Sequence, residues 1–153
     1  MKFIKVFAAI TIAFSTLFAA DENPSALGLQ IGAATVADAK AKYRLEQKKL
    51  GSNKEGELFE IDVSDIKIDG IKQASIYFDK NGKLALIEMT FSDDKFALLC
   101  ESLGEKYTTL LDHRPPTGVK SAIFSAGESK IILEQSHLGT GIVYVANWVL
   151  ASE

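Results

Sequence analysis

The chain is poor in cysteine, histidine and proline. Its 153 residues include one cysteine, two histidines and three prolines. Because Cys100 stands alone, it cannot form an intramolecular disulfide, so the hydrophobic core must stabilise the fold by itself. Basic side chains are also in the minority, 17 against 20 acidic ones. A nucleic-acid partner requires a concentrated basic face, so this balance argues against one.

The N-terminus has the layout of a cleavable signal peptide. Lys2 and Lys5 precede an uncharged run over residues 6–18, a positive segment followed by an apolar one. The run is shorter than the roughly 20 apolar residues that a membrane-spanning helix needs. We therefore predict that residues 1–19 are removed near Ala19, which leaves no stable membrane span. The protein would then be periplasmic or secreted in a bacterium. A retained membrane anchor is the alternative.

The first half of the mature chain predicts one helix and three strands. After a flexible lead-in at 20–26, Thr35 and Asp38 form a capping-box-like pair at the start of a helix. Beyond the helix the hydrophobic period changes to two, which is typical of half-buried strands. Asn81-Gly82 predicts a hairpin between the last two of them. The helix is expected at 36–48, the strands at 58–63, 74–78 and 83–91, and a bent connection at 66–71.

The second half repeats this order. A helix is predicted from about Asp94 to Leu103 or Tyr107, with Cys100 on its apolar side as a buried small hydrophobe. Three strands follow, at 120–126, 130–135 and 141–149. The order helix, three strands, helix, three strands predicts an α+β domain over 27–153, with two helices packed on one face of an antiparallel sheet. It also suggests a tandem duplication, with half-repeats 27–91 and 92–153.

The sequence offers no assembled catalytic, cofactor or metal motif. His113 and His137 lie in predicted loops without neighbouring ligands at metal spacing. No G-x-S-x-G elbow or glycine-rich phosphate loop is present. A calcium loop starting at Asp65 fails because Lys67 and Ile76 stand where oxygen ligands are required. We therefore expect a protein that is not an enzyme and uses no cofactor.

One predicted loop is the candidate interaction site. Residues 112–118 contain two prolines, which break regular structure and make the loop rigid, so little entropy would be lost on binding. A plain connection between helix and strand is the alternative. The candidate residues are Asp112, His113, Arg114, Pro115 and Pro116.

The segment 31–39, with Gly32, Thr35 and Asp38 ahead of a run of strands, resembles small envelope modules. These modules belong to the β-lactamase-inhibitor-protein-like group and to the outer-membrane-assembly lipoproteins related to it. The resemblance implies helices laid against an antiparallel sheet, and a binding or inhibitory protein without a catalytic site. It transfers no functional residue to this chain.

Two functions follow as hypotheses. The first is an exported protein that binds another protein through a sheet face or loops, as an inhibitor, immunity or envelope factor. The alternative is a domain that binds a small apolar ligand or lipid in a pocket between the sheet and the helices.

Overall fold

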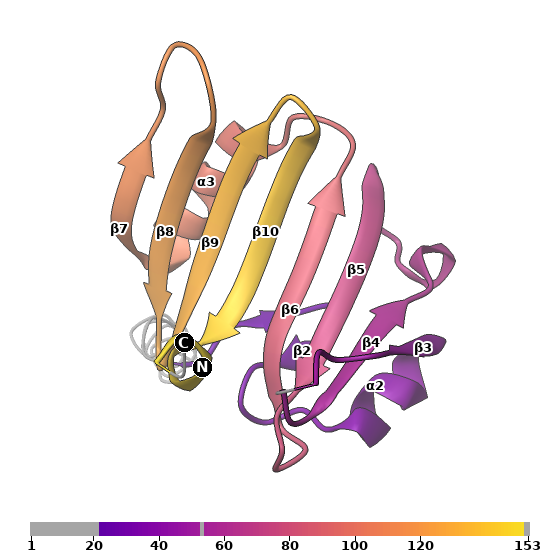
Figure 1. Ribbon diagram of the computed structural model, residues 1–153. Helices are drawn as coiled ribbons and strands as arrows, with labels where there is room; N and C mark the ends of the chain where they lie inside the picture. The colour runs from indigo at the N-terminus through magenta and orange to yellow at the C-terminus, as the bar shows by residue number, and fades with distance from the viewer. Residues whose placement is uncertain (1–21, 53, 152–153) are drawn as a thin grey trace, which may run out of the picture.

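The computed structural model describes residues 22–52 and 54–151, so the predicted signal peptide at 1–19 lies outside the described residues. Eight strands form one antiparallel sheet in the order β3-β4-β5-β6-β10-β9-β8-β7 (Figure 1). They are β3 (Leu45–Lys48), β4 (Glu57–Ile61), β5 (Ile71–Phe78), β6 (Leu84–Phe91), β7 (Thr108–His113), β8 (Lys120–Ala126), β9 (Ser129–Ser136) and β10 (Gly139–Ala146). β1 (Ser25–Ala26) and β2 (Leu29–Gln30) form a separate two-stranded sheet.

The two main helices, α2 (Val36–Lys42) and α3 (Phe96–Lys106), cover the same face of the large sheet. Ala39 of α2 and Cys100 of α3 belong to one hydrophobic core, together with the inward side chains of the strands. Figure 1 shows α3 lying behind β8 and β9. A short 3-10 turn, η1 (Val63–Asp65), and a C-terminal turn of helix, α4 (Asn147–Leu150), complete the elements of the described residues. The α+β fold predicted from the sequence is confirmed.

Local signals placed the start of α2 and the hairpin between β5 and β6 correctly, whereas α3 begins at Phe96 and not at Asp94. The Thr35 side chain accepts a hydrogen bond from the Asp38 N–H at 3.3 Å, and the Asp38 carboxylate accepts one from the Thr35 N–H at 2.8 Å. This is the reciprocal capping box. Between β5 and β6, the Gly82 N–H donates to the Asp79 carbonyl at 2.9 Å, and Gly82 takes the left-handed φ of +76° that the turn requires.

Each half of the sheet has four strands, where the sequence predicted three. The helix expected at 36–48 ends at Lys42, and residues 45–48 form β3, paired with β4 through Leu45 and Ile61. Likewise residues 108–113 form β7, where the sequence predicted no strand and placed residues 112 and 113 in a loop. The last predicted strand ends at Ala146. In the first of these cases, pairing with a distant strand overrides the local helix propensity of the segment.

The two halves meet side by side and follow the same order. Each runs helix, then four strands, and the fourth strands, β6 and β10, pair with each other at the centre of the sheet. The two helices end in the same way. The backbone N–H of Tyr43 donates to the carbonyl oxygen of Ala39 at 3.0 Å, and the backbone N–H of Tyr107 donates to the carbonyl oxygen of Leu103 at 2.8 Å. A tandem duplication would produce this arrangement.

The described part of the predicted flexible lead-in is tied down. Residues 25–26 form β1, and the Asn23 side-chain oxygen accepts hydrogen bonds from the Glu128 N–H at 2.8 Å and from the Ser129 hydroxyl at 3.1 Å. These bonds connect the start of the domain to the turn between β8 and β9. Residues 22–26 thus include a short strand and a side chain that is hydrogen-bonded to the second half of the domain.

Candidate functional site

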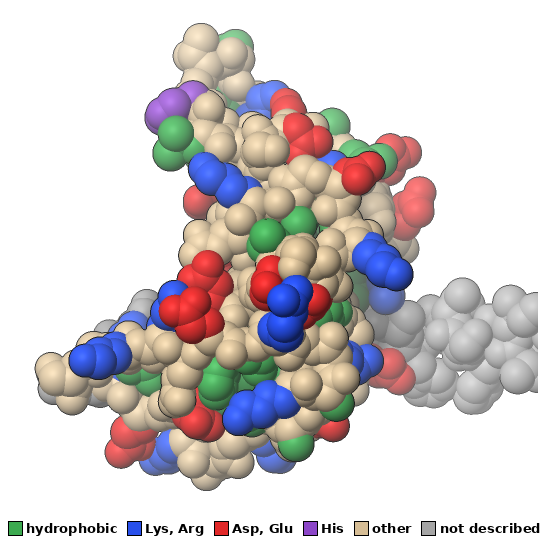
Figure 2. Space-filling view, turned by 90° about the vertical axis from the view of Figure 1, so that its right-hand side faces the viewer, with side chains coloured by type: hydrophobic (Ala, Val, Ile, Leu, Met, Phe, Trp, Pro, Cys, Tyr) green, Lys and Arg blue, Asp and Glu red, His purple; other side chains and the backbone are tan. Residues whose placement is uncertain are grey.

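The face of the large sheet opposite α2 and α3, here called the open face, carries no helix of the described residues (Figure 1). Strand register shows which side chains it presents, because directly paired residues point to the same face. Seen from the β3 edge, the molecule is hollowed on this side (Figure 2). One row of paired residues crosses all eight strands here, in the order Glu46, Glu60, Ser75, Glu88, Val143, Ile132, Ile123 and Leu111.

Half of this row is apolar. From β10 to β7 it holds four aliphatic side chains, and the next row continues the apolar surface toward β4. We call these residues the apolar band: Leu58, Tyr77, Leu86 and Val145 in one row, and Val143, Ile132, Ile123 and Leu111 in the other. Most are half-buried, and Leu111 is 43 % exposed. A solvated sheet face normally carries polar residues at such positions, so the contiguous apolar band is the candidate contact surface.

Three of the four side chains in the other half of the row are acidic, and the fourth is Ser75. Glu46, Glu60 and Glu88 stand on β3, β4 and β6 in direct register with the apolar side chains. The Lys48 ammonium lies 2.8 Å from a Glu46 oxygen and 3.3 Å from a Glu60 oxygen, and its hydrogen bond to Glu46 is the main cause that raises the Lys48 pKa. Glu88 has no ion-pair partner among residues 22–52 and 54–151. A negative charge therefore stands where the acidic and apolar halves meet, opposite Val143.

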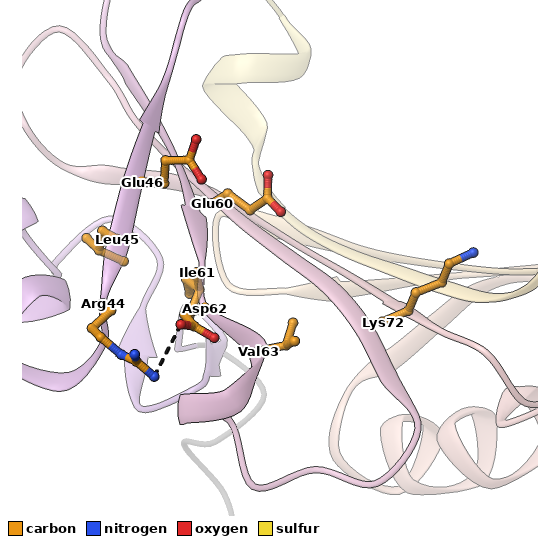
Figure 3. A pocket seen from close by; sticks show the side chains of 8 residues that line it. All are labelled: Arg44, Leu45, Glu46, Glu60, Ile61, Asp62, Val63 and Lys72. Carbon is orange, nitrogen blue, oxygen red and sulfur yellow. Dashed lines mark ion pairs between the residues drawn. The ribbon is translucent and has the colours of Figure 1, made fainter.

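A polar hollow of about 360 Å³ lies at the β3–β4 end of this face (Figure 3). Arg44 points across it to Asp62 at 3.2 Å and also binds Asp65 at 2.9 Å. Hydrogen bonds from Ser64 lower the pKa of Asp62, and hydrogen bonds from Arg44 lower that of Asp65. The charges of Arg44, Asp62 and Asp65 therefore satisfy one another.

A second hollow, of about 460 Å³, lies beside it and has a basic, polar lining. Lys40, Lys42 and Lys67 stand around it together with Arg44 and Asp65. Neither hollow has the apolar lining that a small apolar ligand would need. The predicted ligand-binding alternative therefore gains no support from them.

The predicted interaction residues are divided between a strand and a loop. Asp112 and His113 are not loop residues, because they pair with Ala122 and Ser121 of β8. Arg114 holds Asp112 through two bonds, 2.7 and 2.9 Å long, and its guanidinium lies 5.4 Å from the ring centre of Phe96 in α3. Arg114 is thus turned toward the helix-covered face.

The remaining part of the predicted site, Pro115 and Pro116, follows in the loop between β7 and β8. The two prolines lack backbone N–H donors, and the loop rests on Arg114 at one end. It connects β7 to β8 at one end of the sheet (Figure 1). The structure brings Asp112 and Arg114 together as a pair, but it does not unite the five residues into one surface.

The remaining reactive side chains lie apart. Cys100 is 5 % exposed, and burial raises the pKa of its thiol, partly offset by the neighbouring Arg114. Burial also raises the pKa of Tyr144 to about 12. His137 is exposed in the turn between β9 and β10. Within the described ranges, no three histidine, cysteine or acidic side chains come together as metal ligands.

The comparisons with known proteins add one structural similarity. No family model matches the chain, and no curated protein matches it. Among solved structures, it is similar to a crystal structure of a DUF4309 family protein (YjgB) from Bacillus subtilis subsp. subtilis str. 168. The two share 17 % identity with a TM-score of 0.45, over 86 % of this chain and 92 % of that chain. A likeness at this level indicates nothing about the activity of this chain.

None of the helices in the described part has the length and apolar character needed to cross a membrane. The resemblance to the β-lactamase-inhibitor-protein-like group stays a prediction.

Proposed function

We propose that the protein is an exported, non-enzymatic binding protein that holds another protein against the open face of its sheet. The observation that carries the proposal is the apolar band, a contiguous set of apolar side chains, most of them half-buried, that no helix of residues 22–52 and 54–151 covers. Such a surface costs solvation free energy in water unless a partner removes it from solvent. An inhibitor, an immunity factor or an envelope interaction factor would each use it in this way.

The charges beside the band define the partner's chemistry. A partner with an apolar segment over Val143 and Ile132 would place its neighbouring residues next to Glu88. Because Glu88 has no ion-pair partner within the described residues, a lysine or arginine on the partner would find a free carboxylate there. Electrostatic complementarity of this kind sets orientation and association rate more than affinity. We therefore expect an apolar patch bordered by basic residues on the partner.

Binding is favoured over catalysis by the placement of the reactive groups. The thiol of Cys100 is buried beside Arg114, His113 is the last residue of β7, and His137 lies in the turn between β9 and β10. A nucleophile needs a base within hydrogen-bonding reach, and these three side chains lie on separate elements, α3, β7 and the turn between β9 and β10.

Replacing Ile132 by lysine is expected to reduce partner capture at least about tenfold. The substitution places a charge in the middle of the apolar band, while the half-buried position lets the long side chain reach water without unfolding the sheet. The measurement is affinity capture from an envelope extract of the source cells, with the amount of each bound protein quantified against wild type.

Leu98→Lys is the matched control, because Leu98 is 67 % exposed on α3, away from the open face. It should capture the same proteins as wild type. The proposal fails if Ile132→Lys, with an unchanged melting temperature, binds the wild-type set equally well. It also fails if wild type enriches no protein at any salt concentration.

Export is tested by the intact mass of the protein purified from cells that express the full-length sequence. We expect the denatured mass of residues 20–153, because the basic and apolar segments of a signal peptide precede Ala19. An uncleaved mass would favour the retained anchor and remove the support for a periplasmic or secreted protein.

A further inference from the structure

Glutamates border the apolar band along one of its two long sides. Strands β4, β6 and β9 run in the same direction, because each is separated from the next by one antiparallel neighbour. In each of them a glutamate follows a residue of the band by two positions, so it lies on the same face and on the same side of the band. These pairs are Leu58 and Glu60, Leu86 and Glu88, and Ile132 and Glu134.

Two of the three bordering carboxylates are free to meet a partner. Glu60 lies 3.3 Å from the Lys48 ammonium. Glu88 and Glu134 are exposed, and their carboxylates have no ion-pair or hydrogen-bond partner in the part of the chain that the structure describes. β10, the strand between them, carries Gly141 opposite Glu134, where an added Cβ would meet no atom within 4 Å. The surface between the two carboxylates therefore has room for a long side chain.

The other side of the band carries a positive charge. Lys130 precedes Ile132 by two positions and pairs with Val145 of β10 and Ser125 of β8. Its ammonium likewise forms no ion pair with another described residue. The band thus separates two free carboxylates from a free ammonium. A partner with basic residues on one side of an apolar stripe and an acidic residue on the other would match this pattern in one orientation.

The open face offers side chains to a partner and no free backbone groups. Apart from the two edge strands, each strand of the large sheet pairs with a neighbour on both sides. A segment lying on this face must therefore satisfy its own backbone N–H and C=O groups. An α-helix does so and a single extended strand does not. The hollowed shape of this side (Figure 2) suits such a convex, rod-shaped segment.

The spacing of the glutamates matches the repeat of a helix. β4 and β6 are two strands apart, and so are β6 and β9, which is about 10 Å across the strands. Helix residues seven positions apart lie on one side of the helix and are about 10.5 Å apart along its axis. The band extends from β4 to β7, about 30 Å, the length of a helix of about 20 residues.

We propose that the open face binds an amphipathic α-helix of another protein, laid across the strands. Its apolar stripe covers the band, and lysines or arginines seven residues apart beside the stripe meet Glu88 and Glu134. The inference rests on the proposed function, for which it names the kind of segment that the partner supplies.

Two synthetic peptides test the charge pattern. Both are leucine–alanine helices of about 20 residues with the same apolar stripe; one carries lysine at every seventh position beside the stripe, and the other carries glutamate there. Fluorescence anisotropy of the labelled peptides gives the Kd for the protein purified from cells that express the full-length sequence. We expect the lysine peptide to bind at least about tenfold more tightly than the glutamate peptide, and less tightly as salt is added.

The double variant Glu88→Gln, Glu134→Gln removes both free charges from the border. It should reduce the preference for the lysine peptide to less than about threefold, since the amides keep the size of the side chains without their charge. The matched control is Glu101→Gln, Glu105→Gln, which changes the net charge equally at two exposed positions of α3, on the other side of the sheet. It should keep the wild-type preference.

Ile132→Lys separates this inference from the proposed function. The variant should bind the lysine peptide at least about tenfold more weakly than wild type. Equally tight binding, with an unchanged melting temperature, would place the peptide elsewhere and count against both proposals. Three results would overturn the helix proposal alone: a full preference in Glu88→Gln, Glu134→Gln, an equal loss in the control variant, or no binding of either peptide at the highest soluble concentration.

Discussion

Gly139→Ala is expected to lower the free energy of unfolding by at least about 3 kcal/mol. Gly139 begins β10 with a φ of +122°, a conformation that side chains other than glycine's rarely adopt. A Cβ there would lie 2.0 Å from the carbonyl oxygen of Phe91. That oxygen cannot simply move, because Phe91 is buried and pairs with Thr140 in the central strand pair of the sheet.

The matched control is Gly141→Ala, two residues further along the same strand. A Cβ at Gly141 would have no atom within 4 Å, and its φ lies outside the left-handed region. We expect a change within about 0.5 kcal/mol, since the substitution adds neither strain nor overlap. Urea unfolding of both variants gives the comparison. Equal losses in the two would show that the turn between β9 and β10 does not place Gly139 against β6.

What could be predicted from the sequence rests on local interactions. The capping box of Thr35 and Asp38 and the hairpin at Asn81-Gly82 are decided within a few residues, so the sequence pattern suffices. The burial of Cys100 followed from the spacing of apolar residues on its helix. The α+β class followed from the alternation of such segments.

The two missed strands depend on distant partners. Leu45–Lys48 consists of good helix formers, and only its pairing with residues 58–61 makes it β3. Because Pro115 and Pro116 break regular structure, the sequence placed Asp112 and His113 in the same loop as the prolines. In the structure both residues belong to β7 and pair with β8. A single sequence carries no signal for either pairing, because both are settled when the sheet assembles.

The sequence contained only part of the information about the open face. Residues 131–133 and 142–145 are continuous apolar runs, which indicate strands that are apolar on both faces. Such runs cannot show whether the second face is covered by another layer. The structure supplies that information, since α2 and α3 both lie on the other side. Of the loop residues chosen from the sequence, Asp112 and His113 belong to β7, and Arg114 binds Asp112.

Phe96→Ala is expected to cost about 3–5 kcal/mol of unfolding free energy, the range for removing a fully buried aromatic ring. Phe96 is 1 % exposed and begins α3, where its N–H donates to an Asp94 carboxylate oxygen at 3.0 Å. Its ring lies under the Arg114 guanidinium, so the substitution also removes the contact that holds the start of the β7–β8 loop against the helix. Urea unfolding monitored by circular dichroism measures the loss.

Two further variants separate the contributions of packing and of the ring. Leu98→Ala, on the exposed side of the same helix, should change stability by less than about 0.5 kcal/mol. Phe96→Leu keeps most of the buried apolar volume and removes the cation–π contact, so its cost should fall between the two, at about 1–2 kcal/mol. If Phe96→Ala cost no more than Leu98→Ala, α3 would have to pack through another face. Cys100 and Leu103, which follow Phe96 at helical spacing and share its core, would then be exposed, and the β7 edge would lose the helix-side contact made by Arg114.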